Sequence, residues 1–171
     1  LAQPSSRRVG VIGLGAMGAG IAQSLRRAGH DVHVYDIRAD AAAAFAAQGG
    51  VACATLADMA AACDIVISVV VNAQQTEAVL YGEGGIAAAL RAGAVFVMCS
   101  TVDPSWSIAL EARLAEQGVL YLDAPISGGA AKAAAGQMTM MTAGRAAAYE
   151  ACGAVLELSL IHISEPTRQA E

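Results

Sequence analysis

A glycine-rich hexapeptide near the N-terminus of this 171-residue chain constrains the fold more than any other segment. It follows a short apolar, β-branched run at Val9–Ile12, which predicts a buried strand. It also opens a segment with apolar residues at a spacing of four, which predicts a helix over 16–28 that ends before Gly29. A strand, a glycine-rich turn and a helix in this order are typical of the first unit of a dinucleotide-binding α/β sheet. The residues of the turn, all predicted to contact the cofactor, are Gly13, Leu14, Gly15, Ala16, Met17 and Gly18.

Each glycine of this hexapeptide has a separate predicted role. Gly13 allows the tight turn, Gly15 allows close approach of a pyrophosphate, and Gly18 allows the helix to pack on the strand. The first turn of the helix then presents backbone N–H groups and a partial positive charge to the phosphates. The alternative is a structural turn without a ligand, because glycine-rich hexapeptides also occur in ordinary turns. The flanking strand and helix favour dinucleotide binding.

An acidic residue, Asp36, ends the second predicted strand at 32–35. A carboxylate at this place can accept hydrogen bonds from the ribose hydroxyls of an adenosine and would repel a 2′-phosphate. We therefore expect NAD rather than NADP, and we expect Ile37 to contact the same cofactor. Arg38 weakens this preference, since a guanidinium near the ribose could tolerate a phosphate. If no cofactor binds, Asp36 is simply a solvated strand end.

Strands and helices alternate along most of the chain, which predicts a doubly wound, mostly parallel sheet of the Rossmann type. We expect one domain over 8–157, preceded by a flexible tail at 1–7. The expected strands lie at 9–12, 32–35, 51–52, 65–71, 94–99, 119–122 and 138–142. The expected helices lie at about 16–28, 39–48, 55–62, 73–80, 104–117 and 145–157. The segment 123–129 is expected to be a loop.

The composition indicates a globular protein that binds small molecules. Hydrophobic residues make up 56% of the chain and charged residues 15%, which excludes a disordered chain. A formal net charge of −5 gives no basic surface for nucleic acid or an anionic membrane. The four cysteines form no C-x-x-C pair and the histidines no metal-ligand pattern, so we predict reduced thiols, a cytoplasmic location and no metal. No apolar run reaches the roughly 18 residues of a transmembrane helix.

A second motif, Asp123-Ala124-Pro125-Ile126-Ser127-Gly128-Gly129, accompanies the first. With both motifs present, residues 8–157 resemble the β-hydroxyacid dehydrogenase family, which includes 3-hydroxyisobutyrate dehydrogenases and tartronate semialdehyde reductases. The resemblance implies that Ser127, Gly128 and Gly129 hold the substrate carboxylate. A serine hydroxyl and unobstructed glycine N–H groups suit an anion on chemical grounds as well, although a tight turn without a ligand would look the same.

The resemblance also implies three further cofactor contacts. Thr101 matches a threonine near the nicotinamide, and Asn72 matches a polar residue that ends the fourth strand over the cofactor. Val70, just before Asn72, is included among the expected contacts. For Thr101 and Asn72, a purely structural role in the turns after their strands is an equal alternative.

The residues after the second motif, 130–139, are most similar to the L-threonate dehydrogenase branch of the family. This implies NAD-dependent oxidation of a small hydroxycarboxylate, with 3-hydroxyisobutyrate or tartronate semialdehyde chemistry as alternatives. The family's catalytic lysine lies on a helix beyond this domain, and the only lysine here, Lys132, does not match its context. We therefore assign no catalytic residue and interpret Lys132 as a solvated or substrate-rim charge.

The expected architecture lacks the all-helical C-terminal domain that closes the cleft and joins subunits in the family, so the parent protein is expected to be a homo-oligomer. On this interpretation the isolated chain binds substrate and cofactor without turnover. The alternative from another functional class is a dinucleotide-binding module or sensor. An imine reductase-like relative is a further alternative, but it would not be expected to keep Ser127-Gly128-Gly129.

The last segment, 158–171, resembles the translation of an adapter used in sequencing-library preparation. We expect it to be non-native and to carry no function. Its residues Leu160, Ile161 and Ile163 still have high β-propensity, so they are expected to pair at the edge of the sheet.

Overall fold

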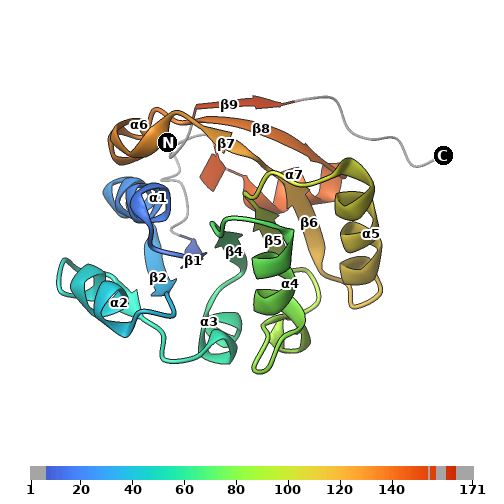
Figure 1. Cartoon of the computed structure of the whole chain (residues 1–171), viewed down its shortest axis with the longest axis horizontal. Helices are drawn as coiled ribbons and strands as arrows, with labels where there is room; N and C mark the ends of the chain where they lie inside the picture. The colour runs from blue at the N-terminus through green and yellow to red at the C-terminus, as the bar shows by residue number, and fades with distance from the viewer. Residues whose placement is uncertain (1–6, 154, 157–160, 165–171) are drawn as a thin grey trace, which may run out of the picture.

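The computed structural model describes residues 7–153, 155–156 and 161–164 (Figure 1). The strands are β1 (Arg8–Ile12), β2 (Asp31–Tyr35), β3 (Val51–Ala52), β4 (Ile65–Ser68), β5 (Val95–Met98), β6 (Leu120–Asp123), β7 (Ile126–Ser127), β8 (Thr139–Gly144) and β9 (Ile161–Ser164). The helices are α1 (Ala16–Arg27), α2 (Ala39–Ala46), α3 (Leu56–Ala62), α4 (Ala73–Tyr81), the 3-10 turn η1 (Ala87–Ala89), α5 (Pro104–Ala115), α6 (Gly129–Ala135) and α7 (Ala146–Cys152).

The strands form a sheet in the order β3-β2-β1-β4-β5-β6-β8-β7, with β9 added on β8. From β3 to β6 all neighbours are parallel, whereas β8 runs antiparallel to β6 and β7. Every residue of β4 and β5 is buried, as expected for central strands covered on both faces. The predicted doubly wound, mostly parallel Rossmann-type sheet is confirmed.

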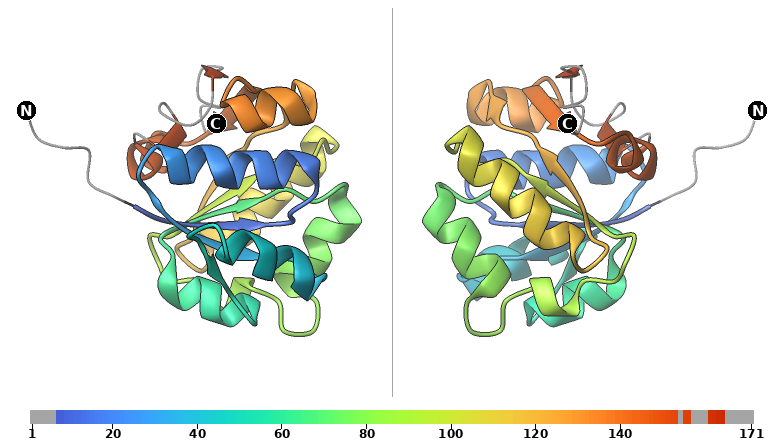
Figure 2. Two further views of the ribbon diagram at one scale, coloured as in Figure 1. Left: turned by 90° about the vertical axis from the view of Figure 1, so that its left-hand side faces the viewer. Right: turned by 90° about the vertical axis from the view of Figure 1, so that its right-hand side faces the viewer.

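Two hydrophobic clusters lie on opposite faces of the sheet. One face is covered by α1, α2, α6 and α7, and the other by α3, α4 and α5. Figure 2 shows α1 lying along the first face with α6 beside it. The two layers bury alternate side chains of the same strands, such as Val97 toward one face and Phe96 toward the other.

The register of the parallel strands aligns their carboxyl ends in one row. Ile12 pairs with both Tyr35 and Ser68, Ser68 pairs with Met98, and Met98 pairs with Asp123. The segments that follow these residues therefore leave the sheet at a single edge. Ligands of open α/β sheets bind at this edge, outside the carboxyl ends of the strands.

The expectation of a loop over 123–129 is wrong in part. Ile126 and Ser127 form β7, which pairs with Met140 and Thr139 of β8, and Gly129 begins α6. Neither element has a clear sequence signal: β7 has only two residues, and α6 is nearly all alanine and so lacks a hydrophobic period. The position of α6 is fixed by α1, because a Cβ at Gly20 would lie 2.6 Å from the Cβ of Ala133.

The C-terminal part contains the strands and the helix that the sequence predicts there. The predicted strand at 138–142 is β8, and α7 with residues 155–156 lies within the predicted helix at 145–157. The expected edge strand is β9, which runs parallel to β8 with Ile161 opposite Thr139. Residues 1–6, 154, 157–160 and 165–171, including most of the two predicted tails, lie outside the described residues. No described helix has the length and hydropathy needed to span a membrane.

Candidate cofactor and substrate site

Gly13 and Gly18 are required by the fold itself. Gly13 has a φ of +91°, and a Cβ there would lie 2.4 Å from the carbonyl oxygen of Val69. A Cβ at Gly18 would lie 1.8 Å from the carbonyl oxygen of Gly13. Both distances are far inside van der Waals contact, so these glycines allow β1, the turn and α1 to pack together. Their predicted roles in the turn and in helix packing are consistent with this geometry.

Gly15 is different, because no contact among the described residues requires it to be glycine. Its φ of −61° is open to any residue, and a Cβ there would meet no atom within 4 Å. It is the N-cap of the twelve-residue helix α1, and no side chain caps this helix end. The space beside Gly15 and the uncapped N–H groups fit the pyrophosphate of a dinucleotide, which needs close backbone approach.

The other residues of the hexapeptide support this turn. Leu14 is buried, and Met17 packs against the core on the side of α1. Ala16 is exposed at the first position of the helix. The hexapeptide therefore fixes its backbone by burying Leu14 and part of Met17 while leaving the helix end open.

Asp36 links the end of β2 to the glycine-rich turn. Its Oδ2 accepts a hydrogen bond from the backbone N–H of Leu14 at 2.7 Å, and its Oδ1 accepts one from the N–H of Arg38 at 2.8 Å. Its side chain is only 8% exposed. Burial alone would raise the pKa of Asp36, but the two backbone hydrogen bonds and the Arg38 guanidinium outweigh it and lower the pKa. The carboxylate is therefore ionised and oriented, and its remaining lone pairs can accept hydrogen bonds from ribose hydroxyls.

Two large apolar side chains are left exposed at this edge. Ile37 follows β2 and is 91% exposed, and Val71 follows β4 and is 79% exposed. Apolar side chains at the carboxyl ends of β-α units can pack on a flat base or nicotinamide ring. The sequence analysis named Ile37 and Val70 as cofactor contacts, and both stay predictions; it did not name Val71. Val70 packs against the hydrophobic cluster that α3, α4 and α5 cover, and its Cγ1 lies 3.6 Å from a Cβ built on Gly13.

Asn72 caps α4. Its Oδ1 accepts a hydrogen bond from the N–H of Gln75 at 2.9 Å, and Oε1 of Gln75 accepts one from the N–H of Val71 at 2.8 Å. This reciprocal pair fixes the start of the helix and the segment before it. Of the two roles that the sequence left open for Asn72, the structural one is present. The side-chain amide N–H₂ of Asn72 is the part that remains for a cofactor.

A pair of buried hydroxyls, which the sequence analysis missed, ties β5 to the segment after β4. Ser100 donates a hydrogen bond to the carbonyl of Val70 at 2.7 Å and lies 3.2 Å from the hydroxyl of Thr76. Thr76 in turn donates to the carbonyl of Asn72 at 3.0 Å. Thr101, the predicted nicotinamide contact, is exposed directly after Ser100. The only sequence signal for this network is a pair of hydroxyl residues whose partners lie far apart in the chain.

The proposed carboxylate motif lies beyond the carboxyl end of β6. Ser127 is exposed at the end of β7, and Gly128 and Gly129 are exposed with φ values of +128° and +74°. Both backbone conformations favour glycine. The motif opens α6, which packs on α1, and Arg27 of α1 donates a hydrogen bond to the carbonyl of Ala134 in α6.

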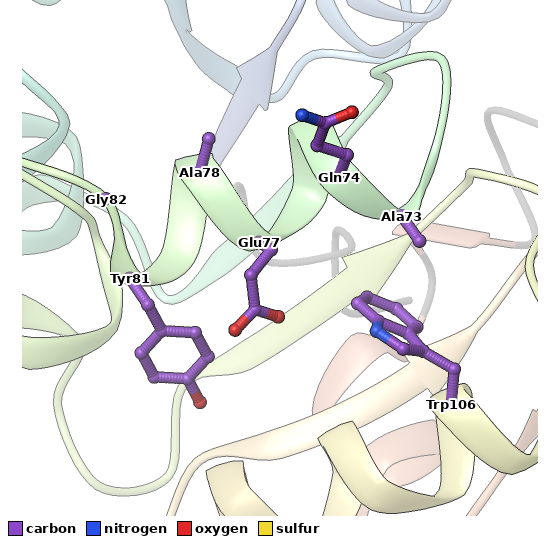
Figure 3. Close-up of a pocket in the computed structure, with 7 residues that line it drawn as sticks. All are labelled: Ala73, Gln74, Glu77, Ala78, Tyr81, Gly82 and Trp106. Atoms are coloured by element: carbon purple, nitrogen blue, oxygen red, sulfur yellow. The ribbon is translucent and has the colours of Figure 1, made fainter.

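A shallow groove of about 430 Å³ lies between α4 and α5 (Figure 3). Glu77 and Tyr81 of α4 face Trp106 of α5 across it. It contains none of the predicted cofactor or substrate residues, so we do not assign the cofactor to it. Arg113 forms an ion pair with Glu77 at 2.9 Å and lies over the ring of Tyr81. Within the described part of the chain, no group of three or more His, Cys, Asp or Glu is placed to hold a metal ion.

Comparisons with known proteins agree with the geometry of this edge. Residues 8–159 match the NAD binding domain of 6-phosphogluconate dehydrogenase. The chain is 57% identical over 151 residues to an L-threonate dehydrogenase from Cupriavidus necator, covering 88% of this chain and 51% of that protein. It is 40% identical over 153 residues to a 2-(hydroxymethyl)glutarate dehydrogenase from Eubacterium barkeri, covering 90% and 51% respectively. The chain thus spans about half the length of these relatives.

A solved structure described as a 3-hydroxyisobutyrate dehydrogenase from Salmonella typhimurium superposes with a TM-score of 0.89 at 34% identity. The match covers 95% of this chain and 56% of that one. The expected resemblance to hydroxyacid dehydrogenases and the expected binding of NAD are therefore confirmed. The chain belongs to the family of NAD-binding domains of 6-phosphogluconate dehydrogenase, together with the hydroxyacid dehydrogenases that it resembles.

Proposed function

We propose that this chain supplies the cofactor-binding and carboxylate-binding part of an NAD-dependent dehydrogenase that oxidises a small hydroxycarboxylate such as L-threonate. The observation that carries the proposal is the single row of strand ends, from which both the Gly15 turn and the Ser127 motif leave the sheet. When bound at this edge, NAD would supply the acceptor for the hydride of the hydroxyl-bearing carbon. The 57% identity to an L-threonate dehydrogenase supports threonate within this class.

Different groups of this chain would bind the cofactor and the substrate carboxylate. The uncapped start of α1 binds the pyrophosphate, and Asp36 accepts hydrogen bonds from the ribose hydroxyls. Ser127 donates its hydroxyl to the substrate carboxylate, while the exposed backbone N–H groups of Gly128 and Gly129 add neutral donors. No residue of the chain is assigned as the general acid or base, so we infer that the isolated chain binds without turnover.

The test is a chimera that joins residues 1–157 to the C-terminal half of the C. necator L-threonate dehydrogenase. We expect the chimera to reduce NAD in the presence of L-threonate and the isolated chain to bind NADH without reducing NAD. Ser127→Ala in the chimera should lower kcat/KM for L-threonate by about 10–100-fold, as expected for a lost hydrogen bond to a charged group. The KM for NAD should change much less, because NAD is expected to bind at the turn after β1 and not at Ser127.

Three results would contradict the proposal or a part of it. A chimera that binds NADH but oxidises no hydroxycarboxylate would favour a dinucleotide-binding module. A chimera in which Ser127→Ala affects NAD and L-threonate equally would place the serine outside the carboxylate site. L-Threonate-dependent turnover by the isolated chain would refute its inferred lack of a general base.

A further inference from the structure

Lys132, the only lysine in the sequence, lies beside the carboxylate motif. It is a residue of α6, four positions after Gly128, which is the N-cap of this helix. A Cβ built on Gly128 would lie 3.2 Å from Cβ of Lys132 and 3.1 Å from its Cδ. The lysine stem therefore occupies the space that a side chain at Gly128 would fill.

The direction of the stem places the ammonium group at the motif. Side chains of an α-helix lean toward its N-terminus, so the side chain at Lys132 runs back over the preceding turn. Its Cδ has already reached Gly128, and Nζ follows two bonds further along the chain. The ammonium group thus lies at the end of α6 from which Ser127, Gly128 and Gly129 project.

The positive charge of Lys132 is not paired with a carboxylate in the part of the chain that the structure describes. No carboxylate among the described residues forms an ion pair with it, whereas Arg38, Arg91 and Arg113 each have a carboxylate partner. The hydroxyl of Ser127 and the glycine N–H groups are neutral donors. Lys132 is therefore the group next to the motif that can add a full positive charge.

We propose that the ammonium group of Lys132 is a second substrate contact, donating a charge-assisted hydrogen bond to the carboxylate held by Ser127, Gly128 and Gly129. The proposal rests on the proposed function, since it requires a carboxylate at this motif. It assigns Lys132 to the selection of organic anions over neutral polyols. Lys132 transfers no proton in this role.

The test is an NMR titration of the ¹⁵N-labelled 171-residue chain, saturated with NADH, with L-threonate and with the neutral polyol L-threitol. The amide signals of Gly128 and Gly129 report binding at the motif. We expect Lys132→Met to raise the Kd for L-threonate about three- to fivefold, as for a solvent-exposed ion pair, and to leave the weaker binding of L-threitol unchanged. Lys132→Arg should restore most of the affinity.

Arg91→Met is the matched control, because it also removes one positive charge but lies at Asp64, away from the motif. Added salt should weaken L-threonate binding by the wild type more than by Lys132→Met, because screening acts on the charge that the variant lacks. Equal Kd values in wild type, Lys132→Met and Arg91→Met would overturn the assignment of Lys132 and leave the carboxylate site standing. If L-threonate moves neither glycine signal in the wild type, the carboxylate site fails, and the assignment of Lys132 fails with it.

Discussion

Replacing Gly15 and Gly18 separately by alanine tests whether the glycine-rich turn serves the fold or the ligand. The added Cβ at Gly18 would lie 1.8 Å from a backbone carbonyl oxygen, which no rotamer change can relieve. Overpacking of this kind costs about 1–3 kcal/mol and sometimes more, so we expect Gly18→Ala to destabilise the fold by about 3 kcal/mol. This is a large part of the roughly 5–15 kcal/mol that holds a domain of this kind together.

Gly15→Ala should behave in the opposite way. Its Cβ meets no protein atom within 4 Å, and its backbone conformation suits alanine. Loss of the N-cap preference for glycine over alanine costs about 0.5 kcal/mol. The same methyl group would, however, occupy the space for the pyrophosphate. Loss of one hydrogen bond to a charged group costs about 1.5–3 kcal/mol, so NADH should bind about 10–100-fold more weakly.

Two measurements separate these effects. Urea unfolding, followed by the fluorescence of the single tryptophan, Trp106, gives the free energy of unfolding of each variant. A titration of NADH fluorescence gives the dissociation constant. The reasoning fails if Gly15→Ala binds NADH with wild-type affinity, or if it destabilises the fold as much as Gly18→Ala.

Four other experiments have equally definite outcomes. The fold lowers the pKa of Asp36, so its carboxylate stabilises the protein at pH values above the ordinary carboxyl pKa. This contribution is lost as the pH falls through the lowered pKa. Asp36→Asn should remove this pH dependence of the free energy of unfolding. Asp36→Ala should reduce the preference for NADH over NADPH in fluorescence titrations. Ser100→Ala leaves the Val70 carbonyl without its donor and should lower the free energy of unfolding by about 1–2 kcal/mol in urea. Burial raises the pKa of the Cys63, Cys99 and Cys152 thiols to about 12. A thiol-specific disulfide reagent at pH 8 should therefore modify only Cys53 rapidly in the native chain. Rapid modification of any of the other three would contradict their packing.

Much of the cofactor edge could be predicted from the sequence because its signals are local. The turn from Gly13 to Gly18 lies between a β-branched run and an amphipathic helix, and both neighbours have periods that can be read within a few residues. Asp36 is recognisable by its place at the end of the next strand. Each of these features depends on residues that are neighbours in the chain, and the structure places them where the pattern predicts.

The parts that were missed depend on residues distant in the chain. Val71 is exposed, whereas Val70 is partly buried against the cluster covered by α3, α4 and α5, and this difference depends on how that cluster packs. The hydrogen bonds of Ser100 join segments 24 and 30 residues apart. No periodicity in a single segment contains that information.

The sequence by itself determined the fold class, the glycine-rich turn after β1 and the acidic residue beside it, since strand and helix periods and glycine conformations are properties of short segments. Only the tertiary structure decided that the segment after β6 pairs with β8 and then forms α6 against α1. It also decided that Lys132 lies over Gly128. The physical reason is that a two-residue strand and an alanine-rich helix have little stability alone, so their positions come from the surfaces on which they pack.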